Sequence, residues 1–258
     1  MGQNFLIDSS IIDEMIKAGN VSEKDEILEI GPGIGSLTEK IIEKGSKVVC
    51  VEKDSRMMGV LKKTLPEKKN LTLLNQDILN FNTEKHLGKN YKILSNLPFY
   101  ISSPVIRKFS TLDHQPSTMI LIIQKALAER MKSKGNKMNF LSVLVHFQCD
   151  VSLIKSVPRT SFWPAPKVDG QIIKLSPHSK YSENNSLRKN FFKVVEAGFL
   201  HPRKQIKNNL SFLEGVKKEK VSSLLKSMNL DPKNRAEDFT LKNWVEITKN
   251  LDFDNLSG

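Results

Sequence analysis

Short β-branched runs alternate with amphipathic segments over residues 1 to about 176, and this alternation constrains the fold more than any other feature. Segments with helical periodicity, such as 37–43 and 57–65, lie between runs that are typical of buried strands. These runs are Glu26–Ile30, Lys47–Val51, Leu71–Leu74, Tyr91–Leu94 and Thr118–Ile123. Strands that alternate with helices predict a parallel sheet with helices on its faces, so the fold class is α/β.

Two segments extend this scheme at its ends. Ser9 or Ser10 is placed to cap a first helix that runs through Ile16. The runs 151–157 and 171–175 flank a proline-rich stretch, 158–166, and predict a closing hairpin at the edge of the sheet.

The composition changes after Pro177. Residues 179–186 are polar and resemble a linker, and the segments 187–200, 203–213, 216–228 and 241–251 have helical periodicity without strand-like runs. We therefore predict a first domain over 1–178 and a small helical domain over 179–258. The basic side chains of the second domain fit either a solvated helix face or an RNA contact.

Net charge narrows the class of partner. The 258 residues carry 40 basic and 28 acidic side chains, a net charge of +12. This balance favours a polyanion, of which nucleic acid is the commonest, although a lysine-rich proteome would give the same excess.

Compartment and metal content follow from what the sequence lacks. No apolar run approaches the ~20 residues that span a bilayer, and the amino terminus does not resemble a secretion signal. Cys50 and Cys149 lie in apolar runs typical of core thiols, and the five histidines are scattered. We expect a reduced, cytoplasmic protein that has no metal site and does not enter a membrane.

A glycine-rich turn, Glu29–Gly35, ends the first strand of the predicted sheet and leads into a helix. Glycine allows positive φ and a close approach of the backbone to a ligand. The dinucleotide pattern G-x-G-x-x-G would need glycine where this chain has Ser36. The turn therefore favours a nucleoside cofactor without a pyrophosphate.

Each of the three predicted strands after the glycine turn is followed by a polar residue at its carboxyl end. Glu52, Asp77 and Asn96 each come at or just after a strand end, one strand-and-helix unit apart. Ligands of open α/β sheets bind beyond the carboxyl ends of the strands, so these side chains and the glycine turn are predicted to line one crevice. Glu52 suits two ribose hydroxyls, and Asp77 with Ile78 suits an adenine amino group. Each acid alone is also explained as a carboxylate leading a helix.

The tetrapeptide Asn96-Leu97-Pro98-Phe99 suits an uncharged amine. The Asn96 amide oxygen and the Pro98 carbonyl can accept hydrogen bonds from an amino group, while Phe99 stacks on a base. Phe162 is a candidate for the other face of that base, or packs within the hairpin. A nucleoside cofactor beside an amine site predicts methyl transfer.

Several segments together resemble the ribosomal RNA adenine dimethyltransferase family, and most closely its small-subunit branch (KsgA/Dim1). They are Gly2–Leu6, Glu29–Gly35, Gln76–Ile78, Asn96–Phe99, Val157–Val168 and Arg235–Glu237. The resemblance implies a Rossmann-like S-adenosylmethionine-dependent sheet over 1–178 and an all-helical RNA-recognition domain over 179–258. It also implies a monomer that acts on the ribosomal small subunit during ribosome biogenesis.

By resemblance, the family's site residues map onto this chain. S-adenosylmethionine would be held by Asn4, Leu6, Gly31, Gly33, Glu52, Asp77, Ile78 and Asn96. Asn96, Pro98 and Phe99 would be catalytic, and Phe99, Phe162, Arg203 and Lys204 would contact the target base or the RNA. The product would be N6,N6-dimethyladenosine at two adjacent adenosines near the 3′ end of small-subunit (16S) rRNA.

Three departures and two alternatives remain. The basic stretch that relatives carry before Gly2 is not present, Phe99 stands where tyrosine is commoner, and Ala126 stands where glutamate is usual. One alternative is a large-subunit rRNA methyltransferase that confers antibiotic resistance, but Leu97 and the Arg235–Glu237 ending favour the small-subunit branch. The other is a non-catalytic RNA-binding assembly factor, which the complete set of pocket residues disfavours.

Overall fold

The computed structural model describes residues 4–65, 68–133, 137–181 and 185–251. Gly2, Gln3 and residues 182–184 of the predicted linker lie outside the described residues. The chain divides into two compact units, one of Met1–Glu129 with Asp150–Pro177, the other of Arg130–Cys149 with His178–Gly258. The boundary after Pro177 coincides with the change in composition, whereas the segment 130–149 groups with the helical unit instead of the sheet.

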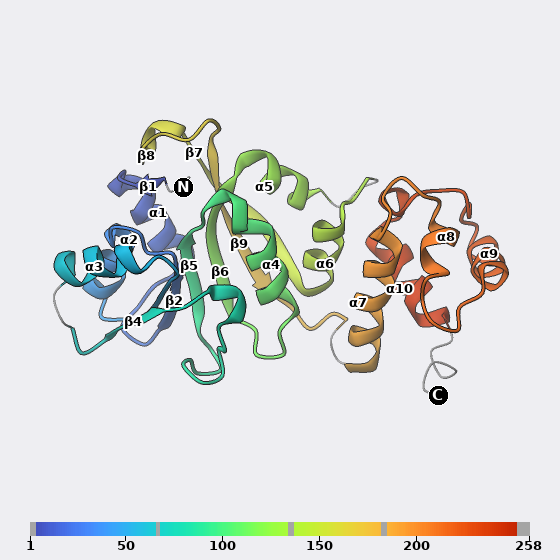
Figure 1. Ribbon diagram of the computed structural model, residues 1–258, viewed down its shortest axis with the longest axis horizontal. Coiled ribbons are helices and arrows are strands. Elements are labelled where there is room, and N and C mark those ends of the chain that lie inside the picture. Colours follow the sequence, from blue (N-terminus) through green and yellow to red (C-terminus); the bar gives the residue numbers. More distant parts are fainter. Residues whose placement is uncertain (1–3, 66–67, 134–136, 182–184, 252–258) are drawn as a thin grey trace. The chain divides into compact units, whose positions relative to one another are not determined.

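The first unit is built on a mixed seven-stranded sheet (Figure 1). Its strand order is β4-β3-β2-β5-β6-β9-β7. The strands are β2 (Glu26–Ile30), β3 (Lys47–Glu52), β4 (Leu71–Asn75), β5 (Lys92–Asn96), β6 (Thr118–Gln124), β7 (Cys149–Val157) and β9 (Gly170–Pro177). The first five strands in this order, β4, β3, β2, β5 and β6, run parallel to one another. β9 pairs antiparallel with β6, and β7 follows it at the edge of the sheet, where the closing hairpin was predicted.

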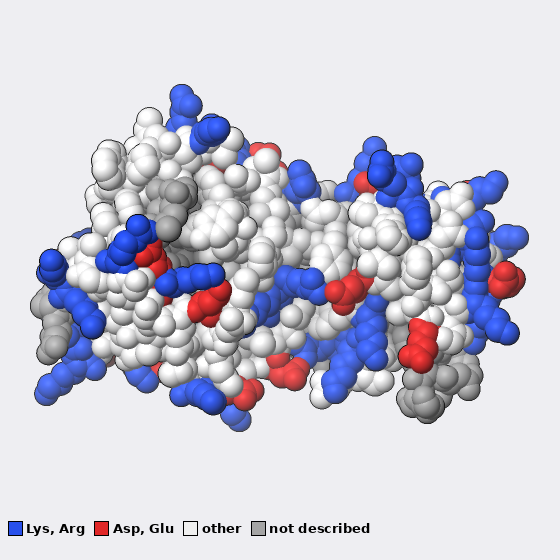
Figure 2. All heavy atoms as spheres, viewed as in Figure 1, with Lys and Arg blue, Asp and Glu red and all other residues white. Residues whose placement is uncertain are grey.

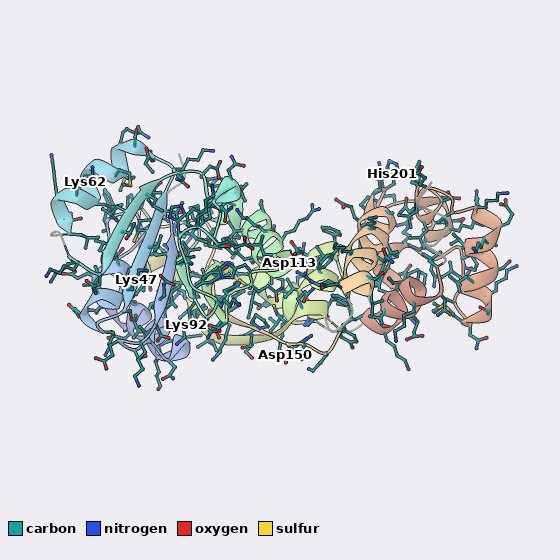
Figure 3. The ribbon with its side chains drawn as sticks, turned by 90° about the horizontal axis from the view of Figure 1, so that it is seen from below. Lys47, Lys62, Lys92, Asp113, Asp150 and His201 are labelled. Carbon is teal, nitrogen blue, oxygen red and sulfur yellow. The ribbon has the colours of Figure 1, made fainter. Side chains whose placement is uncertain are left out.

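The direction of winding reverses between β2 and β5. The chain builds outward from β2 through β3 to β4, then returns to place β5 on the other side of β2. In such sheets the ligand crevice forms at the carboxyl ends of the strands that flank the reversal. At the amino ends of the strands, Lys47 Nζ lies 2.6 Å from Glu26 Oε1 and Lys92 Nζ lies 2.8 Å from Asp25 Oδ1. Figure 3 labels both lysines.

Helices pack on the sheet through apolar faces. They are α1 (Ser9–Gly19), α2 (Ser36–Glu43), α3 (Ser55–Thr64) and α4 (Ser102–Thr111). A further helix, α5 (Lys125–Lys132), follows β6 and crosses the boundary between the two units. Ile11, Ile12 and Met15 of α1 lie in one buried cluster with Ile27 and Ile120 of the sheet. The predicted serine cap of this helix is wrong, because the carboxylate of Asp8 accepts the Ser10 N–H at 3.0 Å and begins the helix one residue earlier.

A second, two-stranded sheet joins distant parts of the sequence. β1 (Phe5–Leu6) pairs antiparallel with β8 (Phe162–Trp163), with Phe5 opposite Trp163 and Leu6 opposite Phe162. Four short 3₁₀ turns complete the described structure, η1 (Ile78–Asn80), η2 (Phe99–Ile101), η3 (Arg159–Ser161) and η4 (Ala236–Asp238).

The helical unit has its own core. It contains α6 (Phe140–Gln148), α7 (Asn185–Phe199), α8 (Ile206–Leu210), α9 (Lys218–Ser227) and α10 (Leu241–Asn250). Phe147 of α6 stacks on Phe191 of α7 with ring centroids 3.7 Å apart, and Trp244 of α10 is completely buried. The aromatic packing of α6 explains why residues 130–149 belong to this unit. Among the described residues, no helix is long and apolar enough to cross a membrane.

Candidate active site

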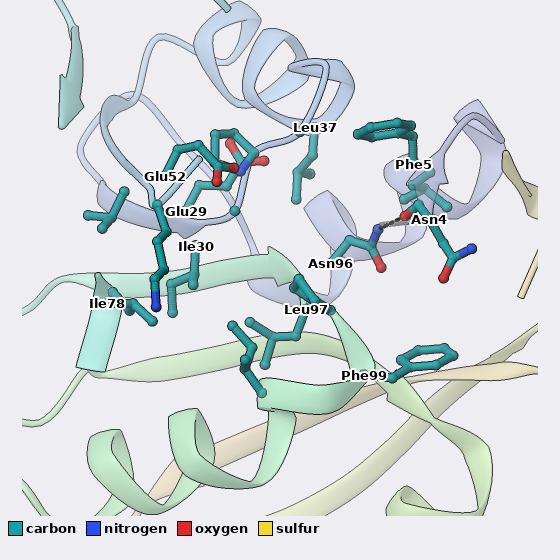
Figure 4. A pocket seen from close by; sticks show the side chains of 18 of the residues that line it. Asn4, Phe5, Glu29, Ile30, Leu37, Glu52, Ile78, Asn96, Leu97 and Phe99 are labelled. Carbon is teal, nitrogen blue, oxygen red and sulfur yellow. Dashed lines mark hydrogen bonds between the residues drawn. The ribbon is translucent and has the colours of Figure 1, made fainter. Parts of the chain in front are cut away.

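A pocket opens at the carboxyl ends of β2, β3, β4 and β5 (Figure 4). The predicted site residues of the first unit all line it: Asn4, Leu6, Gly31, Gly33, Glu52, Asp77, Ile78, Asn96, Pro98, Phe99 and Phe162. Arg203 and Lys204, the two predicted RNA contacts, belong to the helical unit. The polar side chains that follow successive strands therefore lie together at the carboxyl ends of those strands, as their spacing along the sequence predicts.

The glycine turn has the conformation that its composition predicts. Gly31, Gly33 and Gly35 have φ of 64°, 61° and 92°, a region that residues with a Cβ rarely adopt. A Cβ on Gly33 would also lie 2.9 Å from the ring of Phe5. Gly35 serves as the N-cap of α2, so Ser36 takes a helical position where a third pattern glycine is not needed.

Glu52 presents an unused acceptor to the pocket. Its Oε1 accepts the Asp54 N–H at 2.8 Å, while its Oε2 is buried and has no hydrogen-bond partner within the described part of the chain. Burial raises the pKa of Glu52. A buried carboxylate oxygen without a partner is costly, so the geometry suits a ligand that donates hydroxyl groups.

The carboxylate of Asp77 already has two partners within the protein, which the sequence did not predict. Its carboxylate accepts the Leu79 N–H at 2.9 Å and pairs with Lys53 Nζ at 2.8 Å. The hydrogen bond from Lys53 lowers the pKa of Asp77. An amino group that reaches Asp77 must therefore share the carboxylate with Lys53 or replace it.

Lys108 of α4 holds the turn that carries Asp77 and Ile78. Its Nζ donates to the carbonyls of Ile78, Leu79 and Phe81 at 2.8, 3.0 and 2.6 Å. Burial lowers the pKa of Lys108. No sequence pattern indicates this role, because a lysine on an amphipathic helix is ordinarily a surface residue.

Asn96 is the last residue of β5, and its side chain is half buried. Its Nδ2 donates to the main-chain carbonyl of Asn4 at 3.0 Å. The Pro98 carbonyl accepts the Ile101 N–H at 3.0 Å and, at the longer distance of 3.4 Å, the Ser102 hydroxyl. Oδ1 of Asn96 is therefore the acceptor open to an amine, whereas an amine at the Pro98 carbonyl would replace the long bond from Ser102.

Sequence reasoning assigned no role to Glu29, a carboxylate inside the strand β2. Its side chain is 2% exposed, and Thr38 Oγ1 donates to its Oε2 at 2.7 Å. Burial raises the pKa of Glu29 to about 7. The available signal was an acid within the otherwise apolar end of a strand, a pattern that favours a satisfied buried group or a ligand contact.

No group of three metal-binding side chains occurs among the described residues. The pocket combines a glycine turn, acids after successive strands and the tetrapeptide Asn96–Phe99 at the switch point of a parallel sheet. This combination defines a Rossmann-like methyltransferase.

Comparison with known proteins identifies the family. The family model described as ribosomal RNA adenine dimethylase matches residues 1–252, and the chain belongs to this family of S-adenosylmethionine-dependent rRNA adenine methyltransferases. The resemblance stated from the motifs is thereby confirmed.

Two relatives carry the name ribosomal RNA small subunit methyltransferase A. The Pediococcus pentosaceus protein is 34% identical over 267 residues, covering 99% of this chain and 90% of the relative. The Halothermothrix orenii protein is 36% identical over 261 residues, covering 97% and 87%.

Solved structures agree in fold. A dimethyladenosine transferase from Plasmodium falciparum superposes with a TM-score of 0.78 at 26% identity, covering 97% of this chain and 98% of the other. The 23S rRNA methyltransferase ErmE superposes with a TM-score of 0.72 at 21% identity, covering 96% and 100%. The predicted fold class, a Rossmann-like methyltransferase sheet, is confirmed.

Proposed function

We propose that this chain transfers methyl groups to N6 of two adjacent adenosines near the 3′ end of small-subunit rRNA. The observation that carries the proposal is a single pocket that is lined by Asn96, Pro98 and Phe99 together with the glycine turn and Glu52, whose Oε2 has no partner among the described residues. Relatives at 34–36% identity, named as small-subunit methyltransferases, support the choice of subunit. This naming disfavours the large-subunit alternative.

The cofactor fits the residues that line one side of the pocket. Oε2 of Glu52 would accept ribose hydroxyls, since its lack of a partner is otherwise unexplained. Gly31 and Gly33 would let the amino-acid end of the cofactor approach the backbone. Asp77 with Ile78 would face the adenine, and the segment of Asn4 and Leu6 would close over the ligand.

When bound, S-adenosylmethionine supplies an electrophilic methyl group on a sulfonium. Adenine N6 is a poor nucleophile because its lone pair is delocalised into the ring. Acceptors at Oδ1 of Asn96 and at the Pro98 carbonyl would favour a pyramidal nitrogen, worth about 3 kcal/mol at the transition state. Correct alignment of nucleophile and methyl group would supply about 7–11 kcal/mol. No strong general base is required, since the proton leaves after the methyl group arrives.

The target base would be held between two aromatic rings. Phe99 and Phe162 both line the pocket, and Phe162 is 3% exposed. Stacking on such a ring contributes about 1–3 kcal/mol for an extruded base. Phe162 also lies in the buried cluster of Leu6, Val157 and Ile172, so packing within the hairpin stays the alternative explanation for this ring.

The helical unit offers a basic surface to RNA. Lys204 Nζ lies 5.7 Å from the ring centroid of Phe212, which is 56% exposed, and Arg203 is exposed beside it. Lysine and arginine side chains predominate over acids on the face of this unit shown in Figure 2. We propose that Arg203 and Lys204 contact rRNA phosphates, and that the protein acts as a cytoplasmic monomer.

The experiment is methylation of unmodified small ribosomal subunits with labelled cofactor, followed by mass spectrometry of the rRNA. Asn96→Ala is expected to abolish turnover while cofactor affinity stays within a few-fold of wild type. Asn90→Ala, a change at an exposed asparagine, is the matched control and should retain activity. Label on large-subunit adenines, or on no RNA at all, would contradict the proposal.

A further inference from the structure

The side-chain amide of Asn96 has a fixed orientation. Its partner is the main-chain carbonyl of Asn4, an atom that accepts hydrogen bonds and never donates. The NH₂ end of the amide must therefore face Asn4, at 3.0 Å, and the oxygen must face the other way. Figure 4 draws this bond and shows the oxygen on the side away from Asn4.

The Asn4 carbonyl is itself held in place. The Asn4 side chain donates to the Pro164 carbonyl at 2.6 Å, and Leu6 lies opposite Phe162 in the small sheet. Further along, the Ile7 N–H donates to the Ser161 carbonyl at 3.0 Å. We call residues 4–8 the N-terminal strap.

The strap reaches both sides of the pocket. On the cofactor side, the ring of Phe5 lies against Gly33, within 2.9 Å of where a Cβ would be. On the base side, the strap is paired with the strand that carries Phe162. Asn4 stands between them and contacts Asn96.

We propose that the main-chain oxygen of Asn4 is a positioning group for methyl transfer, which selects an amide over a carboxylate at position 96. This inference rests on the proposed role of Asn96 as acceptor for the target amine. By occupying the NH₂ end, Asn4 leaves Oδ1 as the end that can meet N6. An ionised carboxylate has acceptors at both ends, so one oxygen would be repelled by Asn4 and the group would turn.

A protonated carboxyl group restores the pattern, because its O–H can donate to Asn4 while the other oxygen accepts from the amine. Asn96→Asp should therefore be nearly inactive at neutral pH and regain activity as pH falls. Aspartate ordinarily titrates near pH 4, so the protonated fraction rises about tenfold for each pH unit between 8 and 5.5.

The measured quantity is the ratio of kcat for Asn96→Asp to kcat for wild type across that range. The pocket's other titratable side chains are Glu29 of β2, Glu52 and Lys53 at the end of β3, Asp77 after β4 and Tyr100 of η2. Wild type carries the same groups, so their titration largely cancels in the ratio. A rising ratio with falling pH is expected, and a flat ratio would overturn the inference.

A second variant tests the strap directly. Asn4→Ala removes the bond to Pro164 and is expected to lower kcat about tenfold, with a smaller change in KM for the ribosomal subunit. Ser161→Ala is the control, since it removes a bond to Asp8 of 2.8 Å from the same strap without touching Asn4. Equal losses of kcat in the two variants, or none in Asn4→Ala, would contradict the inference.

The two levels of proposal fail separately. Absence of adenine methylation by the wild-type chain removes the proposed function. Methylation by wild type, combined with a flat Asn96→Asp ratio, removes the role of Asn4 alone. Binding of S-adenosylhomocysteine by calorimetry verifies that each variant is folded around its cofactor pocket.

Discussion

Thr38 donates a hydrogen bond to Glu29 at 2.7 Å, and the Cys50 thiol lies 3.7 Å from the same carboxylate oxygen. All three side chains are buried beneath the glycine turn. Burial disfavours the charged form of Glu29 and raises its pKa to about 7, so this pocket-lining carboxyl group is partly protonated near neutral pH.

This titration makes stability depend on pH. The pKa of Glu29 is about 7 in the folded protein and near 4.5 in the unfolded chain, so the folded state binds more protons between these values. Its free energy of unfolding should fall as pH rises through that window, by up to about 3 kcal/mol. Denaturant unfolding at pH 5 and pH 8 checks this, with Glu29→Gln as reference. Parallel pH profiles for the two proteins would refute it.

Removal of one Glu52 acceptor should weaken cofactor binding. In Glu52→Gln an NH₂ group replaces one carboxylate oxygen. The amide oxygen can still accept from one hydroxyl, but the NH₂ group cannot accept from the second. The expected cost is about 2 kcal/mol, roughly thirtyfold in Kd. Calorimetry with S-adenosylhomocysteine measures it, and the exposed Glu43→Gln serves as control. An unchanged Kd would show that Glu52 does not bind the ribose.

Lys108→Met should loosen the turn that follows β4. Three carbonyl groups lose their shared donor, and we expect a loss of about 1–3 kcal/mol in unfolding free energy with a several-fold weaker cofactor Kd. The matched change at an exposed lysine of α3, Lys63→Met, should alter neither quantity. Equal unfolding free energies and equal cofactor Kd values in the two variants would show that Lys108 does not stabilise the turn.

Two helical glycines, one in each unit, should respond in opposite ways to substitution by alanine. A Cβ on Gly198 of α7 would overlap the indole of Trp244, so Gly198→Ala should lower the unfolding free energy by about 1–3 kcal/mol. Gly59 of α3 has open space around it, and Gly59→Ala should raise stability by about 0.5–1 kcal/mol. Thermal or urea unfolding of both variants tests the opposite signs together.

The basic pair in the helical unit should appear in the salt dependence of RNA binding. Arg203→Ala with Lys204→Ala is expected to reduce the slope of log K against log salt by about one to two. The control pair is Lys62→Ala with Lys63→Ala, on α3 of the sheet unit. Identical slopes for both double variants would place the RNA elsewhere.

The sequence predicted the parts of this structure that depend on periodicity and on strand ends. The parallel strands, the glycine turn and the positions of Glu52, Asp77 and Asn96 all follow from local pattern plus the rule that parallel strands end together. The roles of individual site residues stay predictions.

Contacts between distant segments could not be predicted in this way. The Asp8 cap is a local contact with the Ser10 N–H, at a residue type that favours this position, whereas the bond that Asp8 accepts from Ser161, 153 residues away, has no local signal. Lys108 holds a turn 27 to 30 residues earlier, and α6 joined the helical unit through the packing of Phe147. Each of these long-range contacts was decided by tertiary packing.

The N-terminal strap has a practical consequence for anyone who handles this protein. Asn4 and Phe5 line the pocket, so a label or tether attached to the strap itself would stand beside the groups proposed to react. Labels and tethers are therefore better joined at the other end of the chain, in the helical unit.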